Sequence, residues 1–261
     1  VEPMQALEGL MTKLARPMLS ALHILNRNSI RGSKRNISAH YDLGNDFFSL
    51  FLDKQMMYSS AIYPRSDADL DEAAVHKLDV VCRKLGLGPD NHLLEIGTGW
   101  GGLAIHAARH YGCRVTTTTI SHEQYRHACD RVSAEGLQDR ITVLEQDYRL
   151  LEGKYDRIVS IEMIEAVGHQ YLSQYFTQLN RLLADDGMLL LQAITVPDHR
   201  YEFALKNIDF IKRYIFPGGF LPSVRVMMGH LGDDTRLTPL HIEDIGLDYA
   251  RTLADWRSRF V

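Results

Sequence analysis

The sequence predicts an α/β fold organised around a doubly wound, mostly parallel sheet. Between residues 71 and 196, short apolar runs alternate with amphipathic helical patterns, and this alternation requires right-handed crossovers between parallel strands. A glycine-rich turn joins the first apolar run to a helix, which is typical of ligand-binding sheets of this class. The length of 261 residues fits one such domain with some additional elements.

The expected elements follow the chain in a regular order. Residues 71–85 have a helical pattern that leads into the first strand, and Ser121 with Gln124 three residues later forms a capping box for a later helix. A helical insert over residues 198–215 follows the fifth strand, and residues 236–245 fit a sixth strand before a last helix. The five main strands are expected at residues 92–96, 113–119, 141–144, 155–161 and 188–196, with further helices at 103–111, 171–183 and 249–260.

Residues 1–35 are expected to form an amphipathic helix and a basic linker, separate from a main domain over residues 36–261. Apolar residues from Met4 to Leu25 recur at steps of three and four. That face could pack on the main domain, lie on a membrane or contact a preceding domain. Residues 1–40 carry six basic and two acidic side chains, so the rest of the chain has a net charge of −8 within a total of −4.

This charge asymmetry favours an anionic partner, either lipid headgroups or nucleic acid, although a solvated basic linker fits equally well. Residues 1–40 contain no Phe, Trp or Tyr that could stack on bases, and we predict no nucleic-acid partner.

Composition argues against several other classes of protein. No apolar run reaches the roughly 18 residues that span a bilayer, and the start of the chain has no signal-peptide pattern. Cys82, Cys113 and Cys129 lack metal-ligand spacing and are expected to be reduced thiols of a cytoplasmic protein. His106 and His110 lie four residues apart without an acid or third ligand, so no metal site is predicted.

The strongest ligand-binding signal is the turn from Glu95 to Gly101. Gly97, Gly99 and Gly101 allow a tight turn and leave room for a ligand, and the next helix points free amides at it. Glu95 lies in an apolar run, where an acid is costly unless it meets a cationic or hydroxylated ligand. The pattern acid-x-Gly-x-Gly-x-Gly resembles the first motif of Rossmann-like class I S-adenosylmethionine (SAM) methyltransferases and lacks nicotinamide spacing. A glycine turn without a ligand is the alternative.

The other loops at the carboxyl ends of the strands should border the same cleft. Ligands of such sheets bind beyond these ends, near the switch point of the strand order. The loops in question follow residues 95, 119, 146, 161 and 192. Residues 36–48 and 56–63 are rich in aromatic and short polar side chains, which suit either an apolar cavity with a few hydrogen-bonding groups or a packed lid.

In combination, the motifs resemble those of cyclopropane-fatty-acyl-phospholipid synthases and the related mycolic acid methyltransferases. The resemblance runs from about residue 36 to the C-terminus and implies SAM as methyl donor and a cis double bond of a lipid acyl chain as acceptor. It makes residues 36–261 a methyltransferase domain with lipid-binding lid elements. The matching stretches are residues 40–48, 58–61, 95–102, 119–121, 156–160, 215–219 and 221–223.

The resemblance also implies a set of SAM-binding residues. Most methyltransferases of this fold hold the ribose with an acid after the second strand, whereas here the resemblance assigns that task to Gln124, whose amide can bind two hydroxyl groups. Thr119 and Ile120 would line this part of the site, and Asp147 and Tyr148 would border the adenine. The methionine end would be held by Tyr58, Ser59, Glu95, Gly97, Gly99 and Gly101.

An alkene acceptor sets the chemistry of the site. Because an alkene is a poor nucleophile, the enzyme must align the sulfonium methyl group with the π bond in a dry cavity. Methyl transfer leaves a carbocation that aromatic faces can stabilise, with Tyr41, Tyr58, Phe47 and Phe216 as candidates. A base must then take a proton from the new methyl group.

The resemblance implies a bound bicarbonate ion as that base. Its pocket would contain Glu165, the backbone near Ile194, Ser60 in place of a Cys and Gln192 in place of a His, with His169 nearby. A tyrosine from the C-terminal part of the family is expected to lie beyond the end of this sequence, together with the last strand. Gln192 keeps a donor but loses a group that titrates near neutral pH.

Several functions are therefore compatible with the sequence. A remodelled anion pocket could still close the cyclopropane ring, or the proton could leave elsewhere and give a methyl-branched unsaturated chain. Methylation of a small N or O nucleophile is also conceivable, although the flanking motifs argue against it, and so is SAM binding without turnover. The expected location is the cytoplasm, peripheral to the inner face of the membrane and in contact with phospholipid acyl chains. The oligomeric state stays open, and a homodimer is one alternative.

Overall fold

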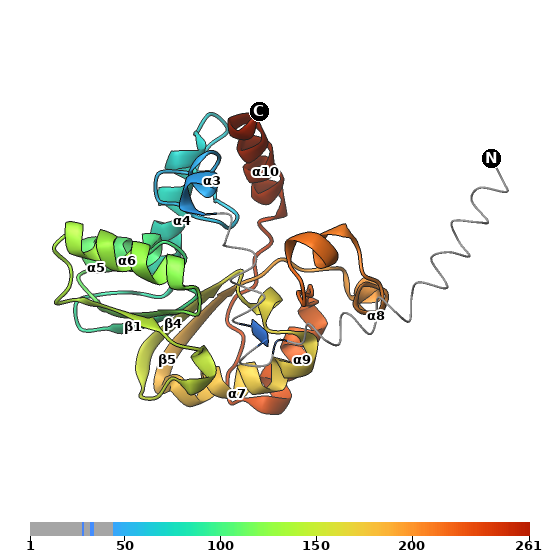
Figure 1. Cartoon of the computed structure of the whole chain (residues 1–261). Helices are drawn as coiled ribbons and strands as arrows, with labels where there is room; N and C mark the ends of the chain where they lie inside the picture. Colours follow the sequence, from blue (N-terminus) through green and yellow to red (C-terminus); the bar gives the residue numbers. More distant parts are fainter. Residues whose placement is uncertain (1–27, 29–31, 34–43) are drawn as a thin grey trace.

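The structure is a computed structural model, and it describes residues 28, 32–33 and 44–261. The described chain has the predicted doubly wound α/β fold, in which five parallel strands run in the order β3-β2-β1-β4-β5 (Figure 1). The strands are β1 (His92–Ile96), β2 (Arg114–Thr119), β3 (Ile141–Glu145), β4 (Tyr155–Ile161) and β5 (Leu183–Gln192).

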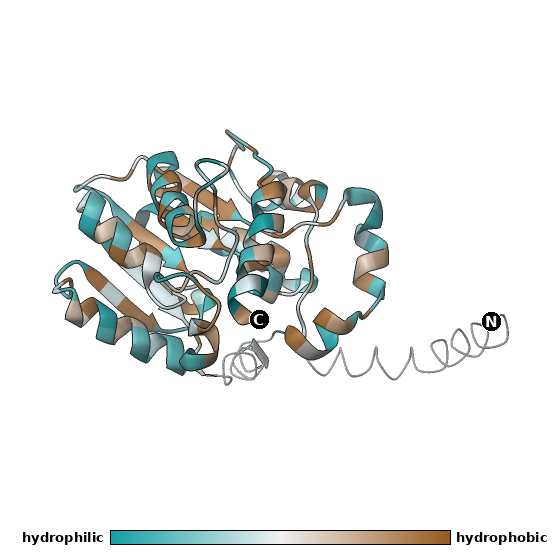
Figure 2. Cartoon of the chain, turned by 90° about the horizontal axis from the view of Figure 1, so that it is seen from above, coloured by the Kyte–Doolittle hydropathy of each residue, from teal (hydrophilic) through white to brown (hydrophobic). Residues whose placement is uncertain are grey.

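Helices cover both faces of this sheet. One face packs against α4 (Leu70–Lys84), α5 (Gly102–Tyr111) and α6 (His122–Ala134). The other face packs against α7 (Leu172–Leu182) and α9 (Val224–Asp234), which also contact each other. Leu93 and Leu94 are neighbours in β1 and are both fully buried, because a parallel sheet with two covered faces excludes water from every side chain of its central strands. Figure 2 shows the apolar residues concentrated on the strands and on the helix faces turned toward them.

Local sequence signals set several helix starts. The Asp69 side chain caps α4 by accepting a hydrogen bond from the Glu72 amide, and Ser121 caps α6 by accepting one from the Gln124 amide, as the sequence predicted. The 3-10 turns are η1 (Tyr148–Leu150), η2 (Ile164–Ala166), η3 (His169–Tyr171) and η4 (Asp198–Arg200).

The region after β5 differs from the prediction. The expected insert over residues 198–215 is broken into η4, α8 (Tyr201–Lys206) and a single π-helical turn, η5 (Ile211–Ile215). The expected sixth strand over residues 236–245 does not form. This segment is irregular, Leu240 and Ile242 are exposed, and Pro239 has no amide hydrogen to donate to a neighbouring strand.

The start and the end of the fifth strand also differ from the prediction. Residues 185–187, between the predicted helix at 171–183 and the predicted strand at 188–196, lie inside β5, where the pairing with β4 shifts register between Tyr155 and Arg157. The strand therefore begins earlier than expected, at Leu183, and ends at Gln192.

The predicted N-terminal helix and most of the basic linker lie outside the described residues. Among the described residues, no helix is both long and apolar enough to cross a bilayer.

The order of the strands creates one switch point. Because β1 lies between β2 and β4, the chain leaves β1 toward one side of the sheet and later continues on the other side. The short helix α3 (Asn45–Ser49) and the C-terminal helix α10 (Gly246–Phe260) pack together above this edge (Figure 1). The loops that carry the predicted site residues therefore converge beneath a cover made from both ends of the described chain.

Candidate active site

The glycine turn after β1 has the conformation that its sequence predicts. Gly97, Gly99 and Gly101 have φ angles of 101°, 52° and 86°, a region that side chains disfavour. Gly97 and Gly99 line a cavity, whereas Gly101 faces α6, where an added Cβ would lie 3.4 Å from the Cβ of Ala128. A ligand can therefore reach the backbone at Gly97 and Gly99, whereas Gly101 lets α5 and α6 pack closely together.

Glu95 is buried at the end of β1 and lines the same cavity. Its carboxylate accepts a hydrogen bond from the Thr117 hydroxyl at 2.6 Å, and this hydroxyl also contacts the Thr98 hydroxyl at 2.7 Å. Burial raises the pKa of Glu95 to about 8, against the opposing effects of Thr117 and of the positive charge of Lys77. A cationic ligand beside Glu95 would favour the ionised carboxylate.

The start of α6 orients Gln124 toward the cavity. The Thr119 hydroxyl donates to the Gln124 side-chain carbonyl at 3.0 Å and accepts from the Ser121 amide at 3.1 Å. Because one hydroxyl links the end of β2 to the first turn of α6, the Gln124 amide is fixed in one orientation. Thr119, Ile120 and Gln124 all line the cavity, as expected for a ribose-binding corner.

The residues predicted to border the adenine, Asp147 and Tyr148, also line the cavity. The carboxylate of Asp147 forms a buried two-point ion pair with Arg149, at 2.8 and 2.6 Å. Arg149 also donates to the carbonyl of Asn28 at 2.9 Å, and Asn28 lines the cavity as well. The Tyr148 hydroxyl is buried without a hydrogen-bond partner among the described residues, and its ring packs edge-on against Tyr175.

Aromatic rings form the roof of the cavity. The Tyr58 ring lies 5.3 Å from Phe48, 5.5 Å from Trp256 and 6.5 Å from Phe216, measured between ring centroids. The cavity has a volume of about 650 Å³ and extends from the glycine turn past these rings to Phe216. Its apolar lining and few polar groups match the predicted acyl-chain site more closely than a polar nucleophile site.

Glu162, which the sequence analysis overlooked, lies where β4 and β5 end. One of its carboxylate oxygens accepts hydrogen bonds from the Ser60 amide and from the Gln192 side-chain amide, both at 2.9 Å. Its own amide donates to the Gln192 carbonyl at 2.8 Å. The donors of Ser60 and Gln192 that were expected to hold a bicarbonate ion therefore already hold a carboxylate of the chain.

Glu165 lies beside this centre, as predicted. One oxygen of its carboxylate accepts a hydrogen bond from the Ile194 amide at 2.6 Å, and the other is buried without a hydrogen-bond partner among the described residues. Burial, and then the charge of Glu162, raise the pKa of Glu165 to about 8. Tyr249 of α10 lines the same cavity, and burial together with both glutamates raises its pKa to about 12. Tyr249 was not among the residues predicted for this pocket, where the resemblance implies a tyrosine beyond the end of this sequence.

Lys77 is the second residue that the sequence analysis missed. It lies on α4, is completely buried, and donates a hydrogen bond from Nζ to the Ser59 hydroxyl at 2.5 Å. Burial lowers its pKa, and the negative charges of Glu162, Asp53 and Glu95 oppose that shift. Lys77 therefore balances the negative charge at this end of the cavity.

Sequence signals for both missed residues existed. Lys77 interrupts the apolar face of α4, between the buried Ala74 and Leu78, and Glu162 directly follows the apolar strand β4. A charged residue in either position is costly without a partner, and this marks it as a candidate. Among the predicted residues, His169 is exposed and is not part of the cavity lining, and Tyr41 lies outside the described residues.

The buried acids predict a pH dependence of stability. The pKa of Glu95 and that of Glu165 are about 8 in the folded chain, above the ordinary value of 4.5, so the folded state binds more protons than the unfolded state between these values. Stability is therefore lost as the pH rises toward 8. Urea unfolding of the ligand-free protein should give a lower free energy at pH 8.5 than at pH 6.5, by roughly 1–3 kcal/mol.

The matched variant for this measurement is E95Q, which should lose part of the slope. The window above pH 6.5 avoids His92, His106 and His127, whose pKa values are lowered by burial and which contribute a slope of opposite sign at lower pH. An unfolding free energy that increases from pH 6.5 to 8.5 in the wild type would contradict this account.

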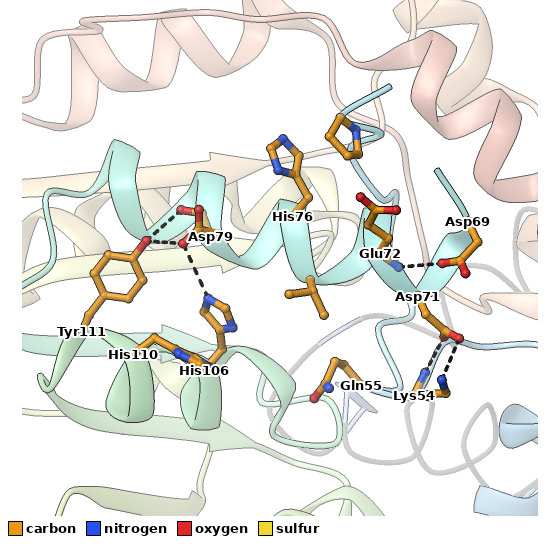
Figure 3. Close-up of a pocket in the computed structure, with 12 residues that line it drawn as sticks. Lys54, Gln55, Asp69, Asp71, Glu72, His76, Asp79, His106, His110 and Tyr111 are labelled. Atoms are coloured by element: carbon orange, nitrogen blue, oxygen red, sulfur yellow. Dashed lines mark hydrogen bonds and ion pairs between the residues drawn. The ribbon is translucent and has the colours of Figure 1, made fainter. Parts of the chain in front are cut away.

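A second hollow on the surface has a different character. It is larger, about 980 Å³, and is lined mainly by charged and polar side chains of α4 and α5. Its acidic side chains have partners: Asp79 accepts from the Tyr111 hydroxyl and faces His106, and Asp71 pairs with Lys54 (Figure 3). It offers little apolar surface for an acyl chain, and we assign the ligand site to the smaller cavity.

Comparison with known proteins agrees with this geometry. Residues 28–261 match the family model described as mycolic acid cyclopropane synthetase. The chain is 41% identical over 236 residues to the tuberculostearic acid methyltransferase UfaA1 of Mycobacterium tuberculosis, covering 88% of this chain and 55% of that protein. It is 42% identical over 223 residues to the cyclopropane-fatty-acyl-phospholipid synthase of Escherichia coli, covering 85% of this chain and 55% of that protein. The chain thus spans about half the length of these relatives.

Solved structures lead to the same group. The cyclopropane synthase MmaA2 from Mycobacterium tuberculosis superposes with a TM-score of 0.80 at 31% identity, covering 87% of this chain and 82% of that one. The mycolic acid cyclopropane synthase CmaA1, in a complex with SAH and CTAB, gives a TM-score of 0.80 at 34% identity with the same coverage. With a family match over most of its length and relatives above 30% identity, the chain belongs to the mycolic acid cyclopropane synthetase family.

Proposed function

We propose that this protein transfers the methyl group of SAM to the cis double bond of an unsaturated phospholipid acyl chain and forms a cyclopropane fatty acid. The observation that carries the proposal is one cavity that joins the glycine turn to a buried pair of glutamates beneath a roof of aromatic rings. The names of the relatives point to lipid chemistry of this kind.

The residues at one end of the cavity fit SAM. Glu95 places a buried carboxyl group beside the glycine turn. A ligand with a sulfonium and an ammonium group would complement this carboxyl group in its ionised form. The fixed amide of Gln124 suits a pair of ribose hydroxyl groups, and the two cavity-facing glycines leave room for the ligand.

The residues at the other end fit the acceptor. The rings of Tyr58 and Phe216 border an apolar space that excludes water from the reacting double bond and offers aromatic faces to a carbocation. The glutamate pair, Glu162 and Glu165, supplies a carboxylate that can accept the proton that leaves the new methyl group. Apolar side chains of Phe203 and Ile211, in α8 and η5, are exposed near the lining residues of η5, and they favour contact with a membrane that delivers the lipid.

A turnover assay tests this function. The protein is incubated with SAM and vesicles of a phospholipid that carries a cis-monounsaturated chain, and its co-sedimentation with the vesicles is measured in parallel. We expect the acyl chain to gain one CH2 in mass and to show high-field cyclopropane methylene protons by NMR, whereas vesicles of a saturated phospholipid stay unchanged. SAM binding without product on the unsaturated lipid would contradict the proposal and favour a binding protein without turnover.

A second product is a methyl-branched unsaturated chain without a ring. It is favoured by the departures from the expected anion pocket, where Gln192 replaces a His and Glu162 occupies the donors. The name of the UfaA1 relative, a methyltransferase, agrees with this product. Both products have the same mass, so NMR separates them: vinyl or vinylidene protons with no cyclopropane signal would identify the branched chain.

A further inference from the structure

We propose that Glu162 is the catalytic base of this enzyme and that its carboxylate takes the place of a bound bicarbonate ion. The inference deepens the proposed function and rests on it, because a base is needed only if a methyl group is transferred to an alkene. It makes the reaction independent of any dissolved anion.

The hydrogen-bond donors around the carboxylate carry the argument. The Ser60 backbone amide and the Gln192 side-chain amide converge on one oxygen of Glu162, and each bond is 2.9 Å long. These two donors come from separate parts of the chain, the loop before α4 and the last residue of β5. The third donor expected for an anion, the Ile194 amide, is taken by Glu165. The residues therefore do not fit a bicarbonate ion, since its donors hold carboxylates that are part of the chain.

The backbone at Glu162 supports a functional assignment. Its φ angle is 47°, in the left-handed region that residues with a Cβ seldom adopt. The described chain has one other such non-glycine residue, Met56. This conformation lets the Glu162 amide bond the Gln192 carbonyl while its side chain turns back over the end of β4. Strain of this kind is retained where the surrounding structure fixes it and often marks a functional site.

The charges around Glu162 suit a base. Lys77 and the two donors stabilise its ionised form, while burial opposes ionisation and raises its pKa. Burial and the charge of Glu162 raise the pKa of the neighbouring Glu165, which favours the protonated form of that carboxyl group. Of the two glutamates, Glu162 is therefore the one with three stabilising partners for a negative charge, and it is the one available to accept a proton.

The proposed step balances as follows. The π electrons of the alkene form a bond to the sulfonium methyl carbon, the S–C bond breaks with its electron pair left on sulfur, and the adjacent alkene carbon becomes a cation. One C–H bond of the new methyl group then breaks, and its proton moves to the Glu162 carboxylate. The released electron pair closes the ring on the cation, or forms a methylene group if a hydride has first shifted. The acid later loses its proton to solvent.

Three variants test the assignment in buffer freed of carbon dioxide and then supplemented with bicarbonate. E162Q keeps the shape and removes the base, and it should lower turnover at least about 100-fold at unchanged SAM affinity. E162G accepts the same φ angle without strain and opens the anion pocket. It should be inactive without bicarbonate and regain turnover with it. E145Q, at the exposed end of β3, is the matched control and should behave like the wild type.

The outcomes separate this inference from the proposed function. Wild-type turnover that is indifferent to bicarbonate supports the inference, whereas a wild type that requires bicarbonate, or an active E162Q, overturns it alone. A wild type without turnover on any cis-alkene overturns the proposed function instead. Titration with 13C-bicarbonate, followed by NMR, then gives a readout that needs no turnover: E162G should bind the ion saturably, and saturable binding by the wild type would overturn the inference.

Discussion

Replacing Lys77 by methionine should lower the free energy of unfolding by about 3–5 kcal/mol, the largest effect that we expect from a single substitution. The methionine side chain fills a similar volume but removes a buried cation that faces Glu162, Asp53 and Glu95. These carboxylates would remain buried without their shared partner. The hydrogen bond from Lys77 to the Ser59 hydroxyl, next to the predicted SAM-binding loop, would be lost as well.

The measurement is urea unfolding at several pH values. Without Lys77 the pKa values of the three acids rise further, so the deficit of K77M should be largest near pH 8 and should shrink toward pH 5, where the acids take up protons. The matched control is K84M on the same helix, which removes a surface pair with Glu243 and should cost between 0 and about 1 kcal/mol. A K77M variant as stable as K84M at pH 8 would contradict the account.

Replacing Gly102 by alanine should destabilise the protein by about 1–3 kcal/mol and weaken SAM binding. Gly102 is the first residue of α5, and an added Cβ would lie 2.8 Å from the Gln55 carbonyl oxygen and 2.7 Å from the Met57 sulfur. The sulfur can move away, but the backbone oxygen can move only with its loop. That loop is fixed by Asp53, whose carboxylate accepts hydrogen bonds from the Gln55 and Met57 amides.

Displacement of this loop would also move Tyr58 and Ser59, which line the cavity. Thermal unfolding and a calorimetric SAM titration measure the two effects. G229A is the matched control, because Gly229 is exposed within α9 and an added Cβ meets nothing within 4 Å. Alanine there should stabilise the helix by roughly 0.5–1 kcal/mol. Equal SAM affinity and stability for G102A and the wild type would show that the loop adapts without cost.

Much of the site was predictable because its signals are local. The glycine turn, the capping pair at the start of α6 and the five strands follow from residue type and short-range spacing, which fix backbone conformation directly. The motifs, taken in combination, also indicate the correct family. Glu165 and Gln192 were placed in one pocket by the family resemblance, and the structure brings them to the same centre.

The predictions failed where the local structure depends on residues that are far apart in the sequence. Residues 236–245 have a strand-like pattern, but a strand needs a partner edge, and Pro239 and the exposed Leu240 show that this segment has none. Tyr249 was overlooked because the two glutamates whose charges raise its pKa, Glu162 and Glu165, lie more than 80 positions earlier in the sequence. No local pattern indicates an effect between residues so far apart.

The sequence alone determined the alternation of helices and strands from residue 71 to β5, the glycine turn and the family, since these depend on periodicity and on residues close together in the chain. Only the tertiary structure decided which groups fill the pocket. Glu162 reaches the amides of Ser60 and Gln192 because parallel strands β4 and β5 end side by side beneath the loop that precedes α4. Because both side chains are buried, the charge of Glu162 interacts strongly with that of Lys77 on α4. The Glu162 carboxylate can take the place of the expected bicarbonate ion only in the folded protein. A buried charge is stable only where the fold supplies partners for it.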